Sequence, residues 1–565
     1  MMIKNYSVWL FCLCISFTTF AQSYEWGGRF GGAGEDVVKK MHVDAEGNSY
    51  VTGYFTDTAD FDITNNESNL TSNGFYDVFV QKTNTEGNLE WAVSIGGAMF
   101  DYGTGITTDS QGNVYVTGYF DETVDFNPGG GEWLLTSQGG GDIFILKLTS
   151  NGEFVWAKSV GGTGYEESTS IDVDELGNVY ILGYLYETVD FDPNLGEALL
   201  TSQGGSDTFL LQLDSAGNFV NVYSYGGEDL DLALDLSVKS SSELFISGYF
   251  AGTTDLDPRP IEEYTVTASG TGFAGYTMQI DETGAITNIA LTEGGNINVY
   301  AIAYDTSNNM YITGNFDGTV NFAPASGSSE YTFTSNEAYN GFVLKVLADG
   351  SVAWAKHMAS DNAYFTYDIV VGANENVYTT GYFSGTADFN PDPTEEFMLS
   401  NESTNPSQAF LLSLDSDGEF VSAYQFGGVG FIDTHQLGID DENNIYLAAQ
   451  FETTVDLNPL PTETEEVTSI DFRDNYLFKF IDGTLSTSTN KLDTIQVYPN
   501  PTTSRLRIQT TDKLLGEKYT IYNLIGQKIA NGTLTENLEI PVDGLKSGLY
   551  VLTIANQNSF KFIKR

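Results

Sequence analysis

The sequence predicts an all-β protein, a seven-bladed β-propeller of four-stranded antiparallel blades followed by a small Ig-like β-sandwich. A unit of 65 to 68 residues recurs, and an apolar residue ends the second strand of each copy: Phe55, Phe120, Leu185, Phe250, Phe316, Phe383 and Phe451. Each copy holds four short segments rich in Val, Ile, Tyr and Phe, separated by turns of Gly, Asn and Asp. Four-stranded antiparallel units at regular spacing are typical of propeller blades.

The two ends of the repeat predict how the ring closes. The seventh copy contains strand segments at residues 436–440, 445–451 and 476–481 and then stops without a fourth strand. The first copy is preceded by an orphan fourth strand at residues 24–32, which matches residues 89–97. We expect the N-terminal strand to complete the seventh blade, because a ring closed in this way leaves only short, protected sheet edges.

The N-terminus is typical of a secretory signal peptide. An apolar run at residues 8–17 is followed by small residues up to Ala21, which predicts a signal peptide over residues 1–21. Neither Cys12 nor Cys14 follows a small residue, so a lipid anchor is not expected. Elsewhere no apolar stretch approaches the roughly 20 residues of a membrane helix, so we expect no transmembrane segment in the mature chain.

The charge divides the chain into two modules. The formal net charge of −54 disfavours nucleic acid and anionic membranes as partners, because phosphate binding needs clustered Lys and Arg. Residues 491–565 carry a net +4 and residues 22–490 a net −59. The predicted organisation is a signal peptide (residues 1–21), a propeller (22–482), a linker (483–494) and a C-terminal domain (495–565).

The repeat carries a recognisable motif. The second copy reads Gly112-Asn-Val-Tyr-Val-Thr-Gly118 and later Asp142-Ile-Phe-Ile-Leu-Lys147. These residues resemble the bacterial β-propeller repeat family whose units read Gly-Asn-x-Tyr-x-x-Gly, and the resemblance covers residues 24 to about 482. It implies a propeller fold and an extracellular setting, and it implies no ligand.

The C-terminal segment carries several motifs in order. They are a Tyr-Pro-Asn-Pro start, a Gly-Gln-Lys turn, a Ser-Gly-Leu-Tyr strand and a basic end, with the key residues Tyr498, Pro499, Asn500, Pro501, Gly526, Gly548, Leu549 and Tyr550. The segment resembles the type A C-terminal sorting domain of the type IX secretion system. The resemblance implies contact with the secretion machinery, export through the periplasm, and attachment at the outer-membrane surface or release.

Repeated acidic and amide residues follow the second strand of six copies in the pattern Asp-x-Asp or Asp-x-Asn. These oxygen ligands suit Ca²⁺, and the candidate calcium residues are Asp60, Asp62, Asp125, Asn127, Asp190, Asp192, Asp255, Asp257, Asp388, Asn390, Asp456 and Asn458. The same residues could instead cap their own turns, because Asp before a turn accepts hydrogen bonds from nearby backbone amides. The sequence leaves both interpretations open and favours the turn caps.

Signals for catalysis are sparse. The three histidines, His42, His357 and His435, share no repeat position, and no hydrolase or phosphate-binding motif is present. The sequence therefore favours a non-catalytic surface binding or adhesion module with a glycan or protein ligand. The alternative is a secreted, calcium-dependent polysaccharide hydrolase or lyase. The repeat is most divergent in copies four and five, at Arg259, Tyr264, Asn315 and Asn321, without an assigned chemistry.

Overall fold

The computed structural model divides the chain into two compact units, Met1–Thr484 and Leu485–Arg565, which are treated separately below. The residues that it describes are 23–259, 262–269, 272–335, 339–360, 362, 364–401, 407–428, 431–460, 464–471, 473–481, 496–498, 502–509, 518–523, 528–535, 538–546, 548–554 and 558–565. The predicted signal peptide and linker lie outside the described residues. In the described part of the chain, no helix has the length and apolar character needed to cross a membrane.

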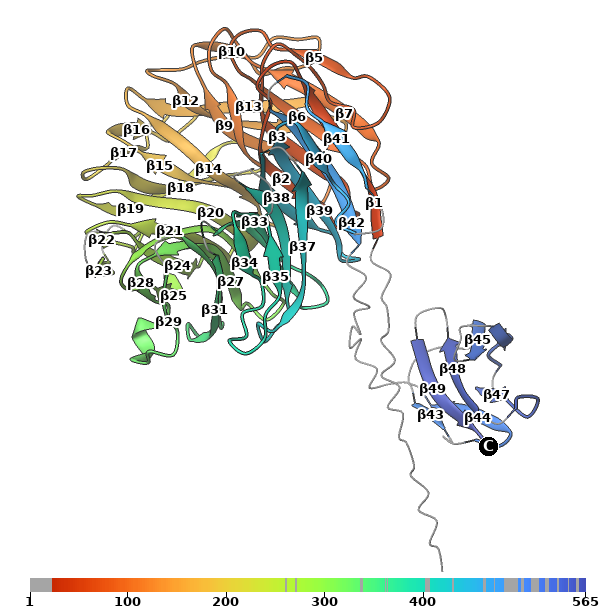
Figure 1. The fold of residues 1–565 in the computed structure, drawn as a ribbon. Coiled ribbons are helices and arrows are strands. Elements are labelled where there is room, and N and C mark those ends of the chain that lie inside the picture. The colour runs from red at the N-terminus through yellow and green to blue at the C-terminus, as the bar shows by residue number, and fades with distance from the viewer. Residues whose placement is uncertain are drawn as a thin grey trace, which may run out of the picture. The chain divides into compact units, whose positions relative to one another are not determined.

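The first compact unit is built from antiparallel four-stranded sets, which we call units 1 to 7 (Figure 1). Unit 1 contains β2 (Val37–Val43), β3 (Ser49–Phe55), β6 (Asp77–Thr83) and β7 (Leu89–Ile95). Unit 2 contains β8 (Tyr102–Thr108), β9 (Val114–Phe120), β12 (Asp142–Leu148) and β13 (Phe154–Gly162). Unit 3 contains β14 (Glu166–Val173), β15 (Val179–Leu185), β18 (Asp207–Leu213) and β19 (Phe219–Gly227). Unit 4 contains β20 (Asp231–Ser240), β21 (Glu243–Phe250), β24 (Ala274–Ile280) and β25 (Ile286–Leu291).

The remaining sets follow the same order of strands. Unit 5 contains β26 (Asn296–Tyr304), β27 (Met310–Asp317), β30 (Asn340–Val346) and β31 (Val352–Ser360). Unit 6 contains β32 (Tyr364–Val371), β33 (Val377–Phe383), β36 (Gln408–Leu414) and β37 (Phe420–Gly428). Unit 7 contains β38 (Ile432–Ile439), β39 (Asn444–Phe451), β42 (Asp474–Ile481) and, from the other end of the chain, β1 (Ser23–Gly32). The prediction of an all-β protein with antiparallel sheets is confirmed.

A short hairpin links the second and third strands of every unit. The hairpins are β4 (Thr58–Asp60) with β5 (Asn69–Thr71), β10 (Thr123–Asp125) with β11 (Leu134–Thr136), β16 (Thr188–Asp190) with β17 (Leu199–Thr201), β22 (Thr253–Asp255) with β23 (Thr265–Thr267), β28 (Thr319–Asn321) with β29 (Thr332–Thr334), β34 (Thr386–Asp388) with β35 (Met398–Ser400), and β40 (Thr454–Asp456) with β41 (Glu466–Thr468). In unit 5 a 3-10 turn, η1 (Pro324–Ser326), interrupts the hairpin. Five hairpins pair with the fourth strand of the preceding unit, so they extend that sheet to six strands.

The N-terminal strand pairs with the last strand of the repeat region. β1 lies antiparallel to β42, with Tyr24 opposite Phe480 and Phe30 opposite Asn475. In Figure 1 the red β1 accordingly lies beside the blue β42. The side chains of Asn475 and Gln436 in unit 7 accept hydrogen bonds from the backbone amides of Val38 (3.0 Å) and Met41 (3.2 Å) in unit 1. Units 7 and 1 are therefore direct neighbours.

The first strand of every unit contains a β-bulge, which releases backbone amides from the ladder. Acidic side chains use these amides to bridge neighbouring units. Asp235 of unit 4 accepts from Ile302 of unit 5 (3.1 Å), and Asp368 of unit 6 accepts from Leu437 of unit 7 (2.8 Å). Lys40 of unit 1 forms an ion pair with Asp235 at 3.3 Å. Burial lowers the pKa of this amine, but the nearby carboxylates outweigh burial and raise the pKa above its ordinary value.

The C-terminal compact unit consists of two antiparallel sheets around one core. One sheet has the order β43 (Gln496–Tyr498), β44 (Arg505–Gln509), β47 (Glu539–Pro541), and the other has the order β46 (Lys528–Thr533), β45 (Lys518–Asn523), β48 (Gly548–Ile554), β49 (Asn558–Lys564). Leu506 and Ile540 from the first sheet share a buried cluster with Ile521, Leu552 and Phe562 from the second. Two sheets that enclose a common core form a sandwich.

Candidate functional site

At four interfaces, a tryptophan on the fourth strand of one unit packs over the next unit. Trp26, Trp91, Trp156 and Trp354 donate their indole N–H to a carbonyl oxygen in the turn between the third and fourth strands of the following unit, at 2.8, 3.0, 3.4 and 3.1 Å. Each ring also lies against the glycine of that turn, where an added Cβ atom would be 2.7 to 3.2 Å from the nearest ring atom. A large aromatic ring buries apolar surface here and the indole N–H finds an acceptor, so this contact seals the interface.

The interface between units 4 and 5 lacks this aromatic ring. Asn288 stands at the tryptophan position and keeps the hydrogen bond, because its Nδ2 donates to the carbonyl of Leu347 at 3.1 Å. Between units 3 and 4 the tryptophan is also missing, but Tyr223, two residues further along the strand, covers the turn at Gly284 instead. The equivalent of Tyr223 in unit 4 is Ala290. The interface between units 4 and 5 therefore lacks an aromatic ring over the turn, but it retains a side-chain hydrogen bond to the backbone of that turn.

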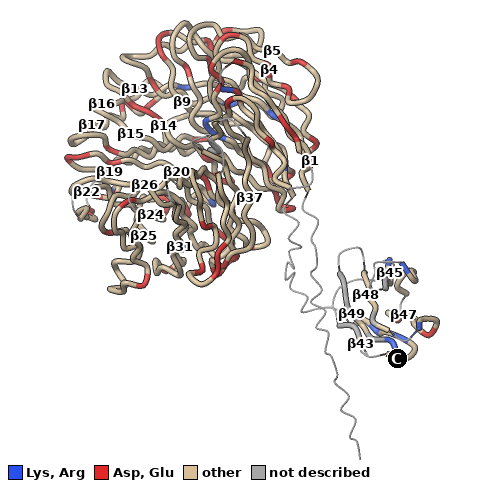
Figure 2. Tube along the Cα trace, viewed as in Figure 1, with Lys and Arg blue, Asp and Glu red and all other residues tan. Residues whose placement is uncertain are grey.

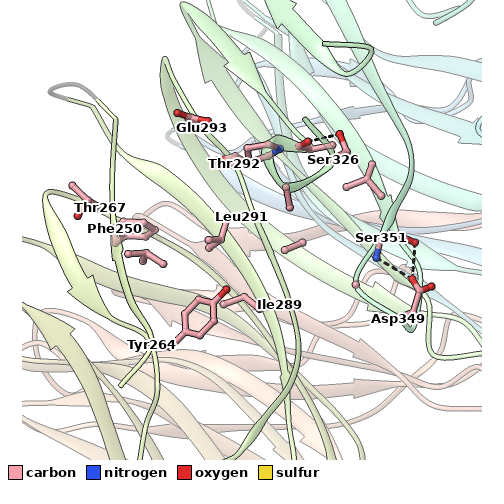
Figure 3. A pocket seen from close by; sticks show the side chains of 17 residues that line it. Phe250, Tyr264, Thr267, Ile289, Leu291, Thr292, Glu293, Ser326, Asp349 and Ser351 are labelled. Carbon is pink, nitrogen blue, oxygen red and sulfur yellow. Dashed lines mark hydrogen bonds between the residues drawn. The ribbon is translucent and has the colours of Figure 1, made fainter. Parts of the chain in front are cut away.

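A cleft of about 650 Å³ opens at this interface (Figure 3). Its walls come from β25 and the hairpins of units 4 and 5, and its end is the turn at Asp349, Gly350 and Ser351. Tyr264, Ile289 and Leu291 form an apolar wall, while Ser351, Thr292 and Glu293 supply polar groups. A second hollow, lined by Arg259, Glu262 and Glu263, shares Tyr264 with the cleft. An apolar, concave surface with a few polar groups is the usual form of a ligand site.

Tyr264 is the aromatic side chain best placed to meet a ligand. It occupies the same hairpin position as Trp133 and Phe397, and the three are similarly exposed, at 38%, 43% and 37%. Trp133 packs on Phe154 with ring centroids 5.5 Å apart, and Phe397 packs on Phe420 at 4.8 Å. Unit 4 has Ile286 at the position of these phenylalanines, and among the described residues no ring partner or hydrogen bond of the Tyr264 side chain is found.

Two carboxylates lie at opposite ends of the cleft in Figure 3. Glu293 stands at a position that is glycine in most units, and its backbone forms a single bridge with Asn321 of unit 5. Asp349 caps its own turn, because its Oδ1 accepts from the Ser351 amide at 3.0 Å and the Ser351 hydroxyl at 2.6 Å. These hydrogen bonds lower the pKa of Asp349, so this carboxylate is ionised at neutral pH. Among the described residues that line the main cleft there is no Lys or Arg, so an anionic ligand does not suit it.

The calcium candidates of the sequence have the geometry of turn caps. In each of the six copies Oδ1 of the first aspartate accepts two backbone amides; for Asp125 these come from Asn127 at 3.0 Å and Trp133 at 2.8 Å. The second residue continues the chain of caps, as Asn127 accepts from Gly129 at 2.9 Å. The same holds at Asp60, Asp190, Asp255, Asp388 and Asp456 and at Asp62, Asp192, Asp257, Asn390 and Asn458. The calcium assignment of these residues stays a prediction.

The divergent residues of copies four and five occupy different environments. Arg259 forms a bidentate pair with Asp257, with distances of 2.9 and 2.7 Å. Tyr264 lines the cleft, and the backbone of Asn321 pairs with that of Glu293. Asn315 is buried, and its side chain accepts a hydrogen bond from the amide of Thr366 at 2.9 Å. The sequence analysis did not identify Asn288, Ala290 and Glu293. Their signal was the break in the tryptophan series, which is visible once the copies are aligned.

Two histidines are half-buried and lie away from the cleft. Burial lowers the pKa of His42 to about 4, and its Nε2 lies 3.0 Å from the Thr108 hydroxyl. Burial also lowers the pKa of His357, whose ring stacks on Phe333 at 4.6 Å. The side chain of His435 lies outside the described residues. Neither described histidine is placed to act on a molecule in the cleft.

The sorting-motif residues lie partly within the described chain. Tyr498 ends β43 with 43% of its side chain exposed. Gly548, Leu549 and Tyr550 begin β48, and the Tyr550 hydroxyl donates to the carbonyl of Lys546 at 3.0 Å. The Tyr550 ring stacks on Phe562 inside the core at 5.7 Å. Residues 499–501 and Gly526 lie outside the described residues.

Comparison with known families agrees with both resemblances. Residues 496–565 match the model of the secretion system C-terminal sorting domain, and residues 95–119 match a beta-propeller repeat model. The chain therefore carries a type IX sorting tail, which implies export and surface attachment. The protein is exported to the cell surface or the extracellular space.

Individual relatives are distant. An uncharacterized WD repeat-containing protein, L264, of Acanthamoeba polyphaga mimivirus is 22% identical over 509 residues, and the match covers 75% of this chain and 36% of the viral protein. PorZ, a surface component of the type IX secretion system of Porphyromonas gingivalis, is 13% identical with a TM-score of 0.27, covering 93% of this chain and 70% of PorZ. A DUF4221 family member from Bacteroides vulgatus is 10% identical with a TM-score of 0.30, covering 82% and 98%. TM-scores this low establish no common fold.

Proposed function

We propose that the protein is a surface-displayed, non-catalytic binding module, and that its seven units form a seven-bladed propeller closed by the N-terminal strand. The pairing of β1 with β42 supports closure, as do the hydrogen bonds from Asn475 and Gln436 to unit 1. The proposed organisation is a signal peptide over residues 1–21, the propeller over 22–482, a linker over 483–494 and the sorting domain over 495–565.

The observation that carries the proposal is the cleft between units 4 and 5. The repeat is broken there at Asn288 and Ala290, and those changes leave a concave surface beside the exposed ring of Tyr264. An aromatic face with carboxylate and hydroxyl acceptors suits a neutral saccharide, because apolar sugar faces stack on the ring and sugar hydroxyls donate to the oxygens. Figure 2 shows how widely Asp and Glu are spread over this compact unit, which also disfavours an anionic ligand.

Binding fits the site better than hydrolysis. Glycoside hydrolysis requires two carboxyl groups on either side of one bond. Glu293 and Asp349 lie at opposite ends of the cleft, and Asp349 is occupied as a turn cap. The C-terminal domain acts separately, by presenting the protein to the type IX secretion machinery. Removal of residues 495–565 is therefore expected to retain the protein inside the cell envelope, as measured by cell fractionation.

The ligand proposal is tested with the secreted protein on an array of neutral glycans, followed by calorimetry with the best binder. Tyr264→Ala should weaken binding at least tenfold. The matched control is Phe397→Ala, which removes an aromatic side chain of similar exposure from the same repeat position and should leave affinity unchanged. Absence of saccharide binding, or equal effects of the two variants, would refute the proposal. Cleavage of the bound saccharide would favour the hydrolase or lyase alternative.

A further inference from the structure

Buried carboxyl groups occur in pairs at some interfaces between units and are absent from others. One member begins the third strand of a unit, and the other stands at the start of the first strand of the next unit. The pairs are Asp77 with Asp101, Asp142 with Glu166, Asp207 with Asp231, and Asp474 with Asp36. All eight side chains belong to residues that are at most 2% exposed.

The two positions change together along the chain. Where the third strand begins with a neutral residue, the next unit carries an apolar or aromatic residue at the facing position: Ala274 with Ile297, Asn340 with Tyr364, and Gln408 with Ile432. No interface combines one carboxyl group with one neutral residue within these described positions. At each of these interfaces the two carboxyl groups are therefore either both present or both absent.

Both members of a pair meet at the same glycine pair. At the interface of units 2 and 3, Glu166 Oε1 accepts the Gly162 amide at 2.8 Å, and a side chain at Gly161 would collide with the carboxyl group of Asp142. At the interface of units 7 and 1, a Cβ on Gly31 would lie 2.5 Å from Asp474 Oδ1 and 2.9 Å from Asp36 Oδ2. Two carboxyl groups thus share one small, enclosed space.

Several oxygens in these spaces are buried and have no hydrogen-bond partner. They are Asp77 Oδ1, Glu166 Oε2, Asp207 Oδ1, Asp231 Oδ1, Asp36 Oδ1 and Asp474 Oδ1. Unpartnered buried carboxylate oxygens are costly, and two ionised carboxylates side by side add electrostatic repulsion. The pairs therefore need a compensating positive charge.

At one of the four interfaces the chain supplies that charge itself. The guanidinium group of Arg29 lies 3.1 Å from Asp474 Oδ2, beside the pair of Asp474 and Asp36. The corresponding residues at the other three interfaces are Ser94, Ser159 and Ser224. Among the described residues, no Lys or Arg forms an ion pair with the carboxylates of these three interfaces.

We propose that the pairs Asp77 with Asp101, Asp142 with Glu166, and Asp207 with Asp231 each hold one Ca²⁺ ion, which tightens the contact between neighbouring units. Two carboxylates neutralise a divalent cation and supply the hard oxygen ligands that calcium prefers. The described residues contain no group of three or more acidic, histidine or cysteine side chains at one point, so backbone carbonyl and water oxygens complete each site. These sites are separate from the turn residues near Asp125 and from the cleft.

The test measures calcium bound to the intact secreted protein after removal of metal with EDTA and dialysis against Ca²⁺. Three equivalents per chain are expected by elemental analysis, together with a higher melting temperature in Ca²⁺ than in EDTA. The double variant Asp142→Asn with Glu166→Gln should bind two equivalents. The chain already carries neutral pairs at other interfaces, so we expect this variant to fold.

Two further variants make the outcome specific. Ser159→Arg copies the arrangement at Arg29 and should also reduce the calcium content by one equivalent while the carboxyl pair remains. Asp125→Asn changes only a hairpin turn and should leave three equivalents bound. The proposal is overturned if no calcium binds at millimolar concentration, or if the double variant retains all three ions. Metal-free protein whose stability depends only on pH would instead show that each pair shares a proton.

Discussion

The interface between units 2 and 3 and that between units 4 and 5 follow one plan, but they carry different side chains. The first has Trp156 over the next turn, two glycines at the end of the fourth strand, and two ladder pairs between β13 and β16. The second has Asn288, Glu293 and a single bridge to Asn321. The backbone path is maintained while the aromatic seal, the carboxyl pair and part of the sheet pairing are lost.

This difference teaches how a regular repeat acquires a specific site. At the interface of units 2 and 3, the carboxyl group of Asp142 fills the space beside Gly161 and permits no side chain there. In unit 4 the equivalent of Asp142 is Ala274, so no carboxyl group stands beside the position of Glu293, and a side chain is permitted there. Loss of the buried carboxyl group at the position of Asp142 therefore permits an exposed carboxyl group at the position of Glu293.

The largest effect is expected from removing the aromatic seal of the closed interface. Trp156→Ala should destabilise the propeller by about 3–5 kcal/mol, because it removes a buried ring and leaves a cavity. Asn288→Ala should cost only about 1 kcal/mol, since one hydrogen bond is lost beside an open cleft. Denaturant unfolding of both variants measures the difference. Equal decreases in the free energy of unfolding would mean that Trp156 and Asn288 stabilise their interfaces equally, which would contradict the contrast drawn between the two interfaces.

A pH dependence should distinguish the interfaces that have carboxyl pairs. Burial raises the pKa of Asp101, Glu166 and Asp231 to about 7, so the folded state binds more protons than the unfolded state between pH 4 and 7. The stabilisation from these groups is present at low pH and is lost as the pH rises through about 7. In EDTA we expect a loss of roughly 2 kcal/mol per pair after allowing for solvent screening.

The melting temperature in EDTA, recorded from pH 5 to 8, measures this decline. The double variant Asp142→Asn with Glu166→Gln should reduce the decrease in melting temperature with pH by the amount that one pair contributes. A replacement within the neutral interface, Asn340→Ala, serves as control and should leave the slope unchanged. A metal-free protein whose stability increases over this range would contradict the assignment of raised pKa values.

Filling the cleft should convert the open interface into a closed one. Ala290→Tyr copies the arrangement at Tyr223 of unit 3, which covers the turn at Gly284 in unit 4. The new ring should stabilise the protein by about 1–2 kcal/mol through burial of apolar area and should abolish saccharide binding. Calorimetry and thermal unfolding on the same sample measure both effects. Retained saccharide binding with higher stability would place the ligand elsewhere.

The repeat made the strands predictable from the sequence, whereas the side-chain contacts between copies could not be predicted from it. Period-2 patterning and Gly-Asn turns located the four strands of each unit, and the missing strand after residue 481 predicted the pairing of β1 with β42. The cleft was only partly visible. Tyr264 was noted as divergent, but the cleft beside it also depends on Ala290, which lines it from another strand.

The carboxyl pairs show the same limit. Asp142 is recognisable as a repeated residue, yet its partner Glu166 lies in the following unit and is Asp in other copies. Only the contact of both with the glycine pair, Gly161 and Gly162, shows that the two positions face each other. Sequence periodicity reports what each copy shares, and contacts between copies require the three-dimensional packing.

The smallest effect is expected at the hairpin turns, which are alike at the closed and the open interface. Asp125→Ala removes the acceptor of the Asn127 and Trp133 amides and should cost about 1 kcal/mol, since these exposed amides can bond to water instead. Asp255→Ala should cost the same in unit 4, where the equivalent amides belong to Asp257 and Tyr264. Both variants should retain the full calcium content. A loss of bound calcium in either one would mean that the repeated aspartates are ligands as well as caps, and it would move the metal sites from the interfaces to the hairpins.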